Sequence, residues 1–509
     1  MEDTTTMVTL IRPELLTLSD AQFSALVPYF ILFAGILVAI IFSVFRKISP
    51  KWWVTLTVLA TALAGLWTTT QLFHDSPVLL FNGMMVADSY SHFFNVVFLA
   101  STALWVLSSI KYLDKESLQH PEYYVLMLMS ALGMMLMTSA LDLIVLFIAL
   151  EVMSLAVYVL VGFRRADRRS NEASVKYFIM GGVASAVMLY GVALLFGATG
   201  SMNIKEILNV VSAHSEVVTP MFTIGAWLVT LGFLFKVASF PFHSWMPDVY
   251  EGAPAPVTGF MTTGLKAAAF ATFVRVFMFL GYGKGLTDAL QSHLHDILWV
   301  VAVLTMLVGN VVALTQTNLK RMLAYSSIAH TGYLLVGVLT GPFSDQGYTP
   351  VVVYLVGYAI MNLGAFVILG MLSGKDDRGL NLHEISGLSQ KHPALAFALA
   401  VFLFSMAGVP PTAGFAAKYL LFYSAVQAGE IALVIIAVLC SAISVYYYLR
   451  VLVFAYMKDP VEGELAAPKL SVLSAITVAL MVVLTFQVGV LPSKLIAAAQ
   501  KAVASLQSS

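Results

Sequence analysis

The chain has 509 residues, of which 60% are hydrophobic and only 11% are charged. Soluble globular proteins contain about 45–50% apolar and about 25% charged residues, so this composition excludes an ordinary soluble fold and predicts a membrane protein. The 27 cationic residues balance the 27 anionic residues, which gives no overall attraction for nucleic acid. The single cysteine, Cys440, excludes an internal disulfide, a Cys-ligated iron–sulfur cluster and a structural zinc site of the cysteine type. Because the usual glycine motifs for nucleotides are also missing from the sequence, we expect no redox cofactor in this chain.

Fourteen apolar runs are long enough to cross a bilayer, whose hydrocarbon core needs about 20 residues of helix. In chain order they are residues 26–45, 52–72, 93–110, 123–140, 143–163, 173–196, 221–240, 257–280, 294–315, 322–339, 351–372, 394–427, 431–457 and 470–490. One long run must be divided near Asp142 to give this number. The runs lack the polar–apolar alternation of barrel strands. The sequence therefore predicts an all-α polytopic membrane protein with about 14 transmembrane helices.

The loops between these runs differ in charge from one side to the other. One side carries 17 cations, namely Arg46, Lys47, Lys51, Lys111, Lys115, Arg164, Arg165, Arg168, Arg169, Lys320, Arg321, Lys375, Arg378, Lys391, Arg450, Lys458 and Lys469. The other side carries Arg12, Lys205, Lys284, Lys494 and Lys501. Positive loops tend to remain in the cytoplasm, so both termini are predicted on the outer side. The segment before residue 26 also lacks the basic start of a cleavable signal peptide.

Charged residues inside the apolar runs each cost about 2.5–3.5 kcal/mol at mid-helix. The five cations not assigned to loops are Lys176, Lys236, Lys266, Arg275 and Lys418, and the clearest anion inside a span is Glu151. Such groups normally face the protein interior or water and mark functional sites.

Three short segments recur in the same order at nearly the same spacing. Residues 158–162 resemble 333–337, residues 177–180 resemble 358–361, and residues 233–241 resemble 402–410. The spacing covers five predicted spans, and an odd number turns the second copy over, as in the inverted repeats of transporters. We expect an N-terminal three-helix segment (1–120), a first five-helix repeat (121–290), a second inverted repeat (291–457) and a C-terminal helix (458–509).

Both repeats contain proline where a helix should still continue. Pro241 and the pair Pro410–Pro411 should each break a helix, because proline lacks an amide hydrogen and clashes with the preceding turn. Open backbone at membrane depth is tolerated only inside protein or beside a water-filled cavity. Lys236 comes shortly before the first break, whereas Ser405 occupies the matching place in the second copy. The two repeats therefore need not work identically.

The segment K-V-A-S-F-P-F-H-S-W-M-P-D-V-Y-E-G-A-P-A-P-V-T, residues 236–258, resembles the signature of the antiporter-like subunits of the proton-pumping NADH–quinone oxidoreductase, respiratory complex I. The resemblance extends over nearly the whole chain. Residues 247–254 resemble the N-type subunits more than the M- and L-type subunits. The M type has a glutamate at the late broken helix, where this chain has Lys418, and the L type has a long lateral helix for which this chain has too few C-terminal residues.

This resemblance implies a proton pathway. By their local motifs, Glu151 matches the glutamate of the fifth helix, Lys236 the lysine of the first broken helix that pairs with it, Lys266 the connecting lysine of the eighth helix, and Lys418 the terminal lysine of the second broken helix. His330 resembles a relay residue between them and Lys176 an accessory one.

The resemblance further implies a subunit that translocates protons in response to quinone reduction elsewhere in the complex. NADH, FMN, iron–sulfur clusters and quinone are then expected in partner subunits. The implied partners are the neighbouring M-type antiporter-like subunit, the small K- and J-type subunits and the lipid bilayer. The implied location is a bacterial inner (plasma) membrane.

Burial disfavours the charged form of lysine, so a buried lysine can take up and release protons. A nearby Glu151 carboxylate would hold Lys236 charged, and separation of the pair would let its proton move on to Lys266. Such a step competes with a membrane potential worth about 2.3 kcal/mol per charge per 100 mV. The electrostatic free energy of forming or breaking a buried ion pair is of that order or larger.

Structural explanations stand beside these roles. Glu151 and Lys236 can form a pair that only stabilises helix packing, Lys418 can extend to the membrane interface, and His330 can be a satisfied polar core residue. Lys176 can belong to the basic cluster at the cytoplasmic ends. The four arginines between 164 and 169 are most simply topology determinants, and Arg275 a helix-end or inter-subunit contact, since guanidinium hardly deprotonates.

Two other functions remain open from the sequence. The chain can be a subunit of a multisubunit cation/proton antiporter or a membrane-bound hydrogenase, whose subunits share this fold. It can also be a structural spacer that conducts no protons.

Overall fold

The computed structural model describes residues 18–45, 49–72, 76–280, 282–283, 288–377, 379–460 and 471–508. Within these residues, 12 helices are long and apolar enough to cross a membrane, and Pro220–Lys236 and Pro393–Ala407 are shorter apolar helices. Residues 1–17 and several cations assigned to loops, including Arg46, Lys47, Lys284 and Lys469, lie outside the described residues. The chain is thus a multi-pass membrane protein, and the predicted all-α fold is confirmed.

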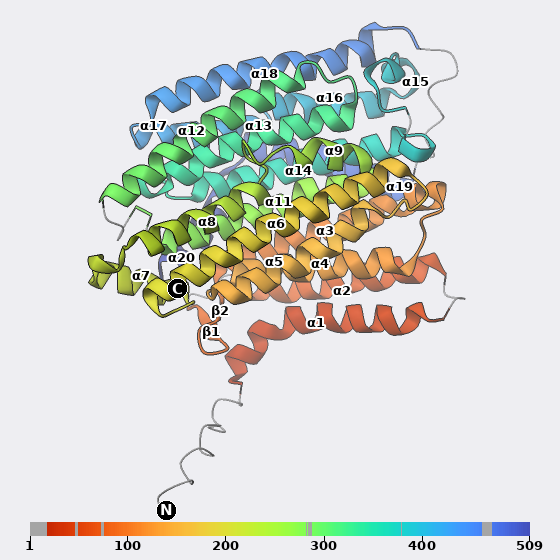
Figure 1. Cartoon of the computed structure of the whole chain (residues 1–509). Coiled ribbons are helices and arrows are strands. Elements are labelled where there is room, and N and C mark those ends of the chain that lie inside the picture. Colours follow the sequence, from red (N-terminus) through yellow and green to blue (C-terminus); the bar gives the residue numbers. More distant parts are fainter. Residues whose placement is uncertain are drawn as a thin grey trace, which may run out of the picture.

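The long helices run side by side and span the molecule from one end to the other (Figure 1). They are α1 (Asp20–Ser43), α2 (Pro50–Gln71), α3 (Ser89–Glu116), α4 (Pro121–Ser139), α5 (Leu143–Val161), α6 (Arg168–Thr199), α12 (Asp288–Ala313), α13 (Leu319–Thr340), α14 (Thr349–Leu372), α18 (Ile431–Met457) and α19 (Val472–Val490). One further span is made of three consecutive pieces, α10 (Ala255–Phe260), the π-helical turn η3 (Met261–Leu265) and α11 (Lys266–Phe279).

The predicted division near Asp142 is confirmed. Helix α4 ends at Ser139, and the Asp142 carboxylate caps α5 by accepting hydrogen bonds from the backbone N–H groups of Ile144 (2.8 Å) and Val145 (3.2 Å). A capping aspartate satisfies amides that the first helical turn leaves open. One polar residue therefore ends what otherwise reads as a continuous apolar run.

Several short elements were not among the predicted spans. They are the hairpin of β1 (Val78–Leu80) and β2 (Met85–Ala87), and the helices α7 (Ile204–Ala213), α15 (Leu388–Lys391) and α20 (Ser493–Ser508). The hairpin, α7 and α20 lie at one end of the bundle and α15 at the opposite end (Figure 1). This arrangement agrees with the predicted alternation of loops, which places Lys205 and Lys494 on one side and Lys391 on the other. The boundary that we expect between the first and second repeats, at residues 290 and 291, falls inside the first turn of α12.

Two helices are interrupted, and each interruption contains prolines. Helix α8 (Pro220–Lys236) stops before residues 237–244, which include Pro241, and α9 (Trp245–Gly252) follows. Helix α16 (Pro393–Ala407) and α17 (Ala413–Gln427) are separated by residues 408–412, which include Pro410 and Pro411.

The backbone groups freed at these breaks find partners within the protein. Thr331 Oγ1 donates to the carbonyl of Val237 (2.7 Å), and the Gly414 amide donates to Ser405 Oγ (3.0 Å). Such pairing is what allows non-helical backbone at membrane depth. Gly408 adopts a φ of 90°, which favours glycine directly after the end of α16.

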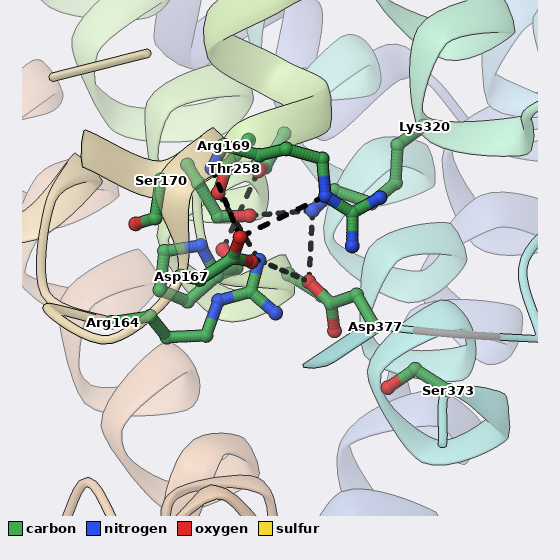
Figure 2. A network of polar contacts seen from close by, with 12 residues as sticks. Arg164, Asp167, Arg169, Ser170, Thr258, Lys320, Ser373 and Asp377 are labelled. Atoms are coloured by element: carbon green, nitrogen blue, oxygen red, sulfur yellow. Dashed lines mark hydrogen bonds and ion pairs between the residues drawn. The ribbon is translucent and has the colours of Figure 1, made fainter. Parts of the chain in front are cut away.

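A buried ionic network joins separate segments at the end of the bundle opposite to α7 (Figure 2). The Asp377 carboxylate accepts hydrogen bonds from Lys320 Nζ (2.9 Å) and Tyr112 Oη (2.8 Å) and lies 3.4 Å from Arg164 Nη2. Lys320 Nζ also donates to the carbonyls of Glu251 (3.0 Å) and Ala253 (2.5 Å). The network thereby links α3, the α5–α6 loop, α9, α13 and the segment after α14.

Two sequence interpretations are corrected by this network. Lys320 was assigned to a charged loop, but its side chain is 1% exposed within the first turn of α13. Arg164 was explained as a topology determinant, but its side chain is 5% exposed and bonded to the carbonyl of Gly252 (3.1 Å). Both cations are held by carbonyls and by Asp377, which a charge count along the sequence does not reveal.

The pKa of Asp377 reflects the same contacts. Burial by itself would raise the pKa of this carboxyl group, but the charges of Lys320 and Arg164 outweigh burial and lower the pKa below its ordinary value of 3.8. A lowered folded-state pKa gives stability that is fully present above the unfolded-state pKa and is lost as the pH falls through the folded-state pKa.

We expect Asp377→Asn to lower the free energy of unfolding by about 3–5 kcal/mol, because Lys320 and Arg164 would remain buried with too little negative charge. The loss should be constant between about pH 5 and 8, where the native carboxylate is fully ionised. Thermal unfolding of the purified assembly at several pH values measures it.

Asp345→Asn is the matched control, since Asp345 is exposed and the same chemical change should then cost little. Equal stability of the Asp377 and Asp345 variants would contradict a structural role for the network.

Candidate functional site

Lys236 is the last residue of α8, directly before the first interruption. Its Nζ donates to Ser154 Oγ (3.0 Å) and lies 3.3 Å from Tyr158 Oη, both on α5. Glu151 lies one turn before Ser154 and accepts a hydrogen bond from Ser185 Oγ of α6 (2.5 Å). The expected pairing of Glu151 with Lys236 is therefore not a direct contact, since no ion pair within 4.0 Å joins these two described side chains.

Lys266 follows the π-helical turn η3, and it is 4% exposed. Its Nζ donates to the carbonyl (2.5 Å) and the hydroxyl (2.7 Å) of Ser327 on α13 and lies 4.8 Å from the centre of the Tyr358 ring. Within the described chain no carboxylate pairs with it. Neutral oxygens and an aromatic face thus stabilise its charged form, which is weaker compensation than an ion pair.

His330 lies one turn beyond Ser327 on α13 and is 1% exposed. Its Nδ1 is 2.6 Å from Tyr354 Oη, and its Nε2 is 3.3 Å from Tyr448 Oη. Tyr448 is in turn hydrogen-bonded to Ser326. Both ring nitrogens therefore have a hydroxyl partner that can donate or accept.

Lys418, on α17, is 5% exposed, so its side chain is covered by the protein. Its Nζ donates to the carbonyls of Met406 (2.9 Å) and Ala407 (3.1 Å), the last residues of α16, and to Ser441 Oγ (2.9 Å). The second helix break thus supplies the carbonyl oxygens that hold this ammonium group, because helix C-termini leave carbonyls unpaired.

His330 connects the two fully buried lysines through aromatic rings. Its imidazole lies 5.0 Å from the Tyr358 ring and 5.6 Å from the Tyr333 ring. Lys266 Nζ lies over the first of these rings (4.8 Å) and Lys418 Nζ near the second (5.2 Å). The structure therefore brings Lys266, His330 and Lys418 together as one buried polar line across α11, α13 and α17.

Lys176 lies apart from this line. It is on the third turn of α6 with 42% of its side chain exposed, and it pairs with Glu172 (2.7 Å) and Asp248 (2.9 Å). Asp248 also binds Arg321 (2.7 Å). Lys176 thus belongs to a charged cluster at the helix ends.

Arg275 is completely buried and pairs with Asp88 at 2.8 Å. This intramolecular pair replaces the inter-subunit contact considered from the sequence. Arg275 still lies near the end of α11, as expected.

Sequence reasoning missed the neutral partners of the charged groups. They are Ser154, Tyr158, Ser185, Ser327, Tyr333, Tyr354, Tyr358, Ser441 and Tyr448. Helical spacing offers a partial signal, since Ser154 follows Glu151 by three residues and Ser327 precedes His330 by three. The tyrosines come from other helices, and no local spacing identifies them.

The described residues contain no group of three or more His, Cys, Asp or Glu side chains that can hold a metal ion. The polar line is accordingly built from ammonium, imidazole, hydroxyl and carbonyl groups, which are suited to proton transfer and ion binding.

Comparison with known proteins gives concordant results. Residues 140–444 match the family model described as NADH:quinone oxidoreductase/Mrp antiporter, TM. The chain is 44% identical to NADH-quinone oxidoreductase subunit N of Trichlorobacter lovleyi, covering 87% of both chains. It is 32% identical to a chain of respiratory complex I from Thermus thermophilus with bound aureothin, with a TM-score of 0.77 and coverage of 92% of this chain and 98% of that chain.

A chain of the Mrp complex from Dietzia sp. DQ12-45-1b shares the fold, with a TM-score of 0.80, 22% identity and coverage of 95% of this chain and 97% of that chain. The subunit N relatives, by contrast, are similar in sequence over most of their length as well as in fold. On these grounds the chain belongs to the family of NADH-quinone oxidoreductase subunit N.

Proposed function

We propose that this chain is a proton-translocating subunit of the membrane arm of an NADH-quinone oxidoreductase. The observation that carries the proposal is the buried line in which His330 lies between the aromatic rings beside Lys266 and Lys418. A charged group in this position is costly. A role in proton transfer explains these buried titratable groups better than a role in helix packing does, because apolar residues would pack the helices at a lower free-energy cost.

The proposed path begins at Glu151 and Lys236 and continues through Lys266 and His330 to Lys418. Lys266 has neutral oxygen partners only, so it can lose its proton without leaving a buried carboxylate unpaired. His330 can accept a proton at one ring nitrogen and release one from the other. Tyr354 and Tyr448, bonded to those nitrogens, fix the ring for this exchange.

The gap between Glu151 and Lys236 supplies the electrostatic control. With Glu151 held by Ser185 and Lys236 held by Ser154, the two charges are close but not in contact. Movement of either side chain from its serine would form an ion pair, worth several kcal/mol at an effective dielectric constant of about 20. That change is comparable to the work of moving a charge against the membrane potential.

The rest of the assignment follows from family membership. NADH oxidation, iron–sulfur transfer and quinone reduction would take place in partner subunits, and the assembled complex would be the enzyme. An M-type subunit and small K- and J-type subunits are the proposed neighbours in a bacterial inner membrane, with both termini on the periplasmic side. The two interrupted helices would belong to two inverted repeats, residues 121–290 and 291–457.

The two other functions are less well supported. The antiporter alternative rests on likeness in fold to a chain of the Mrp complex at 22% sequence identity, and the hydrogenase alternative rests on the sequence resemblance alone. In a non-conducting spacer, Lys266 would be a buried cation without a carboxylate partner, which destabilises the fold and serves no function.

Lys266→Met should reduce the rate of proton transfer through this chain by about 10²-fold or more, because it removes a titratable group from the path. The number of protons pumped per NADH by the reconstituted complex should fall, while NADH oxidation by an artificial acceptor should persist. Lys266→Arg should be equally impaired, since guanidinium keeps its proton.

Lys391→Met is the control, because Lys391 is exposed at the end of the bundle. Full pumping by Lys266→Arg would mean that titration at this position is not required, and it would support the spacer.

Tyr354→Phe should slow proton transfer about tenfold, because loss of the hydrogen bond to His330 Nδ1 costs about 1–1.5 kcal/mol. The pH dependence of pumping should shift together with the rate, since the bond affects how readily the imidazole binds a proton.

Tyr446→Phe removes the hydroxyl of an exposed tyrosine, 62% accessible, and is the matched control. A slower rate with an unchanged pH profile would assign Tyr354 to packing only.

A further inference from the structure

A basic cavity of about 800 Å³ lies at the end of the bundle that carries the ionic network. It is bordered by the α3–α4 connection, the α5–α6 loop and the segment after α14. Its cationic lining residues are Arg164, Arg165, Arg168, Arg169 and Lys375. The proton path proposed above uses none of them.

The acidic residues of the lining do not neutralise this charge. Glu116 lies 3.8 Å from Lys115, which is outside the cavity lining, and Asp167 lies 3.6 Å from Arg164 and 3.7 Å from Arg169. The only other carboxylate in the lining is Glu122, an exposed residue. Five cations therefore face three anions, and Arg165, Arg168 and Arg169 are exposed to whatever enters.

Arg164 is the buried member of the basic lining. Its side chain is 5% exposed, and its Nη2 serves Gly252 and Asp377. Its Nε and Nη1 have no hydrogen-bond partner, and both atoms are inaccessible to solvent. Contact with an anion in the cavity therefore falls to the guanidinium groups of the exposed Arg165, Arg168 and Arg169, which match phosphate oxygens. The start of α6 at Arg168 places the positive end of a helix dipole at the same wall.

We propose that this cavity binds the phosphate headgroup of an anionic phospholipid. The arginine fork suits phosphate oxygens, and the surplus of basic residues suits an anionic lipid over a zwitterionic one.

The apolar surface of α6 argues for a lipid over a soluble phosphate. Val175, Ile179 and Val183 are 55%, 57% and 63% exposed, and they continue along the face of the helix on which Arg168 lies. A headgroup at Arg168 would therefore have its acyl chains laid along this stripe. A free phosphate or nucleotide would leave the stripe unused.

The test uses the purified complex in nanodiscs of phosphatidylcholine that contain a photoactivatable phosphatidylglycerol with its reactive group near the headgroup. Peptide mapping should find the label in the α3–α4 connection and in residues 163–169. Arg168→Gln combined with Arg169→Gln should reduce this labelling about tenfold or more, since each basic residue near an anionic headgroup contributes substantially to binding.

Lys51→Gln combined with Lys458→Gln removes two exposed cations that do not line the cavity, and it should leave the labelling unchanged. Excess unlabelled phosphatidylglycerol should compete with the probe, whereas inorganic phosphate should not. Displacement by inorganic phosphate would identify a soluble anion as the ligand and overturn the lipid assignment. Equal labelling of the Arg168/Arg169 variant and the wild type would overturn the site itself.

Discussion

The dominant constraint on this molecule is the presence of ammonium groups in the middle of a membrane-spanning bundle. Each must find oxygen or aromatic partners there, because no bulk water is available and the cost of an unsatisfied charge is high. Lys418 obtains them from the carbonyls at the end of α16, and Lys266 from Ser327. The interruption between α16 and α17 and the position of Ser327 on α13 beside Lys266 thus have a common electrostatic reason.

The two interruptions solve this problem differently. At the first, Lys236 ends the helix itself and reaches across to hydroxyls on α5. At the second, the lysine comes from the following helix and turns back to the carbonyls of the preceding one. Ser405, at the place that matches Lys236, accepts a hydrogen bond from the Gly414 amide and closes the backbone. Similar sequences around the prolines therefore support unlike charge arrangements, as the absence of a second matching lysine indicated.

The positions of the central charged residues were predictable from the sequence because charge in an apolar run is a strong signal. Lys266 and Lys418 stand out on that basis, and Pro241 and Pro410 locate the interruptions. The partners were not predictable, because Tyr354 and Tyr448 approach His330 from separate helices and tyrosine is common in this chain. Lys320 and Arg164 were misassigned for a related reason. The sequence does not distinguish a helix-end cation that is solvated by water from one that, as here, is buried against Asp377 and backbone carbonyls.

The π-helical turn before Lys266 has a geometric consequence. Residues 261–265 form a wider turn within a span that is buried on all sides. Such a turn accommodates one residue more than an α-helical turn, and each residue rotates an α-helix by about 100°. Removing a residue from this stretch would restore a regular helix only by rotating either α10 or α11 about its axis. The ammonium group of Lys266 would then leave Ser327, or the packing of α10 against its neighbours would be lost. The rotation that the π-helical turn gives to α11 relative to α10 is therefore as necessary for the position of the ammonium group as the lysine itself.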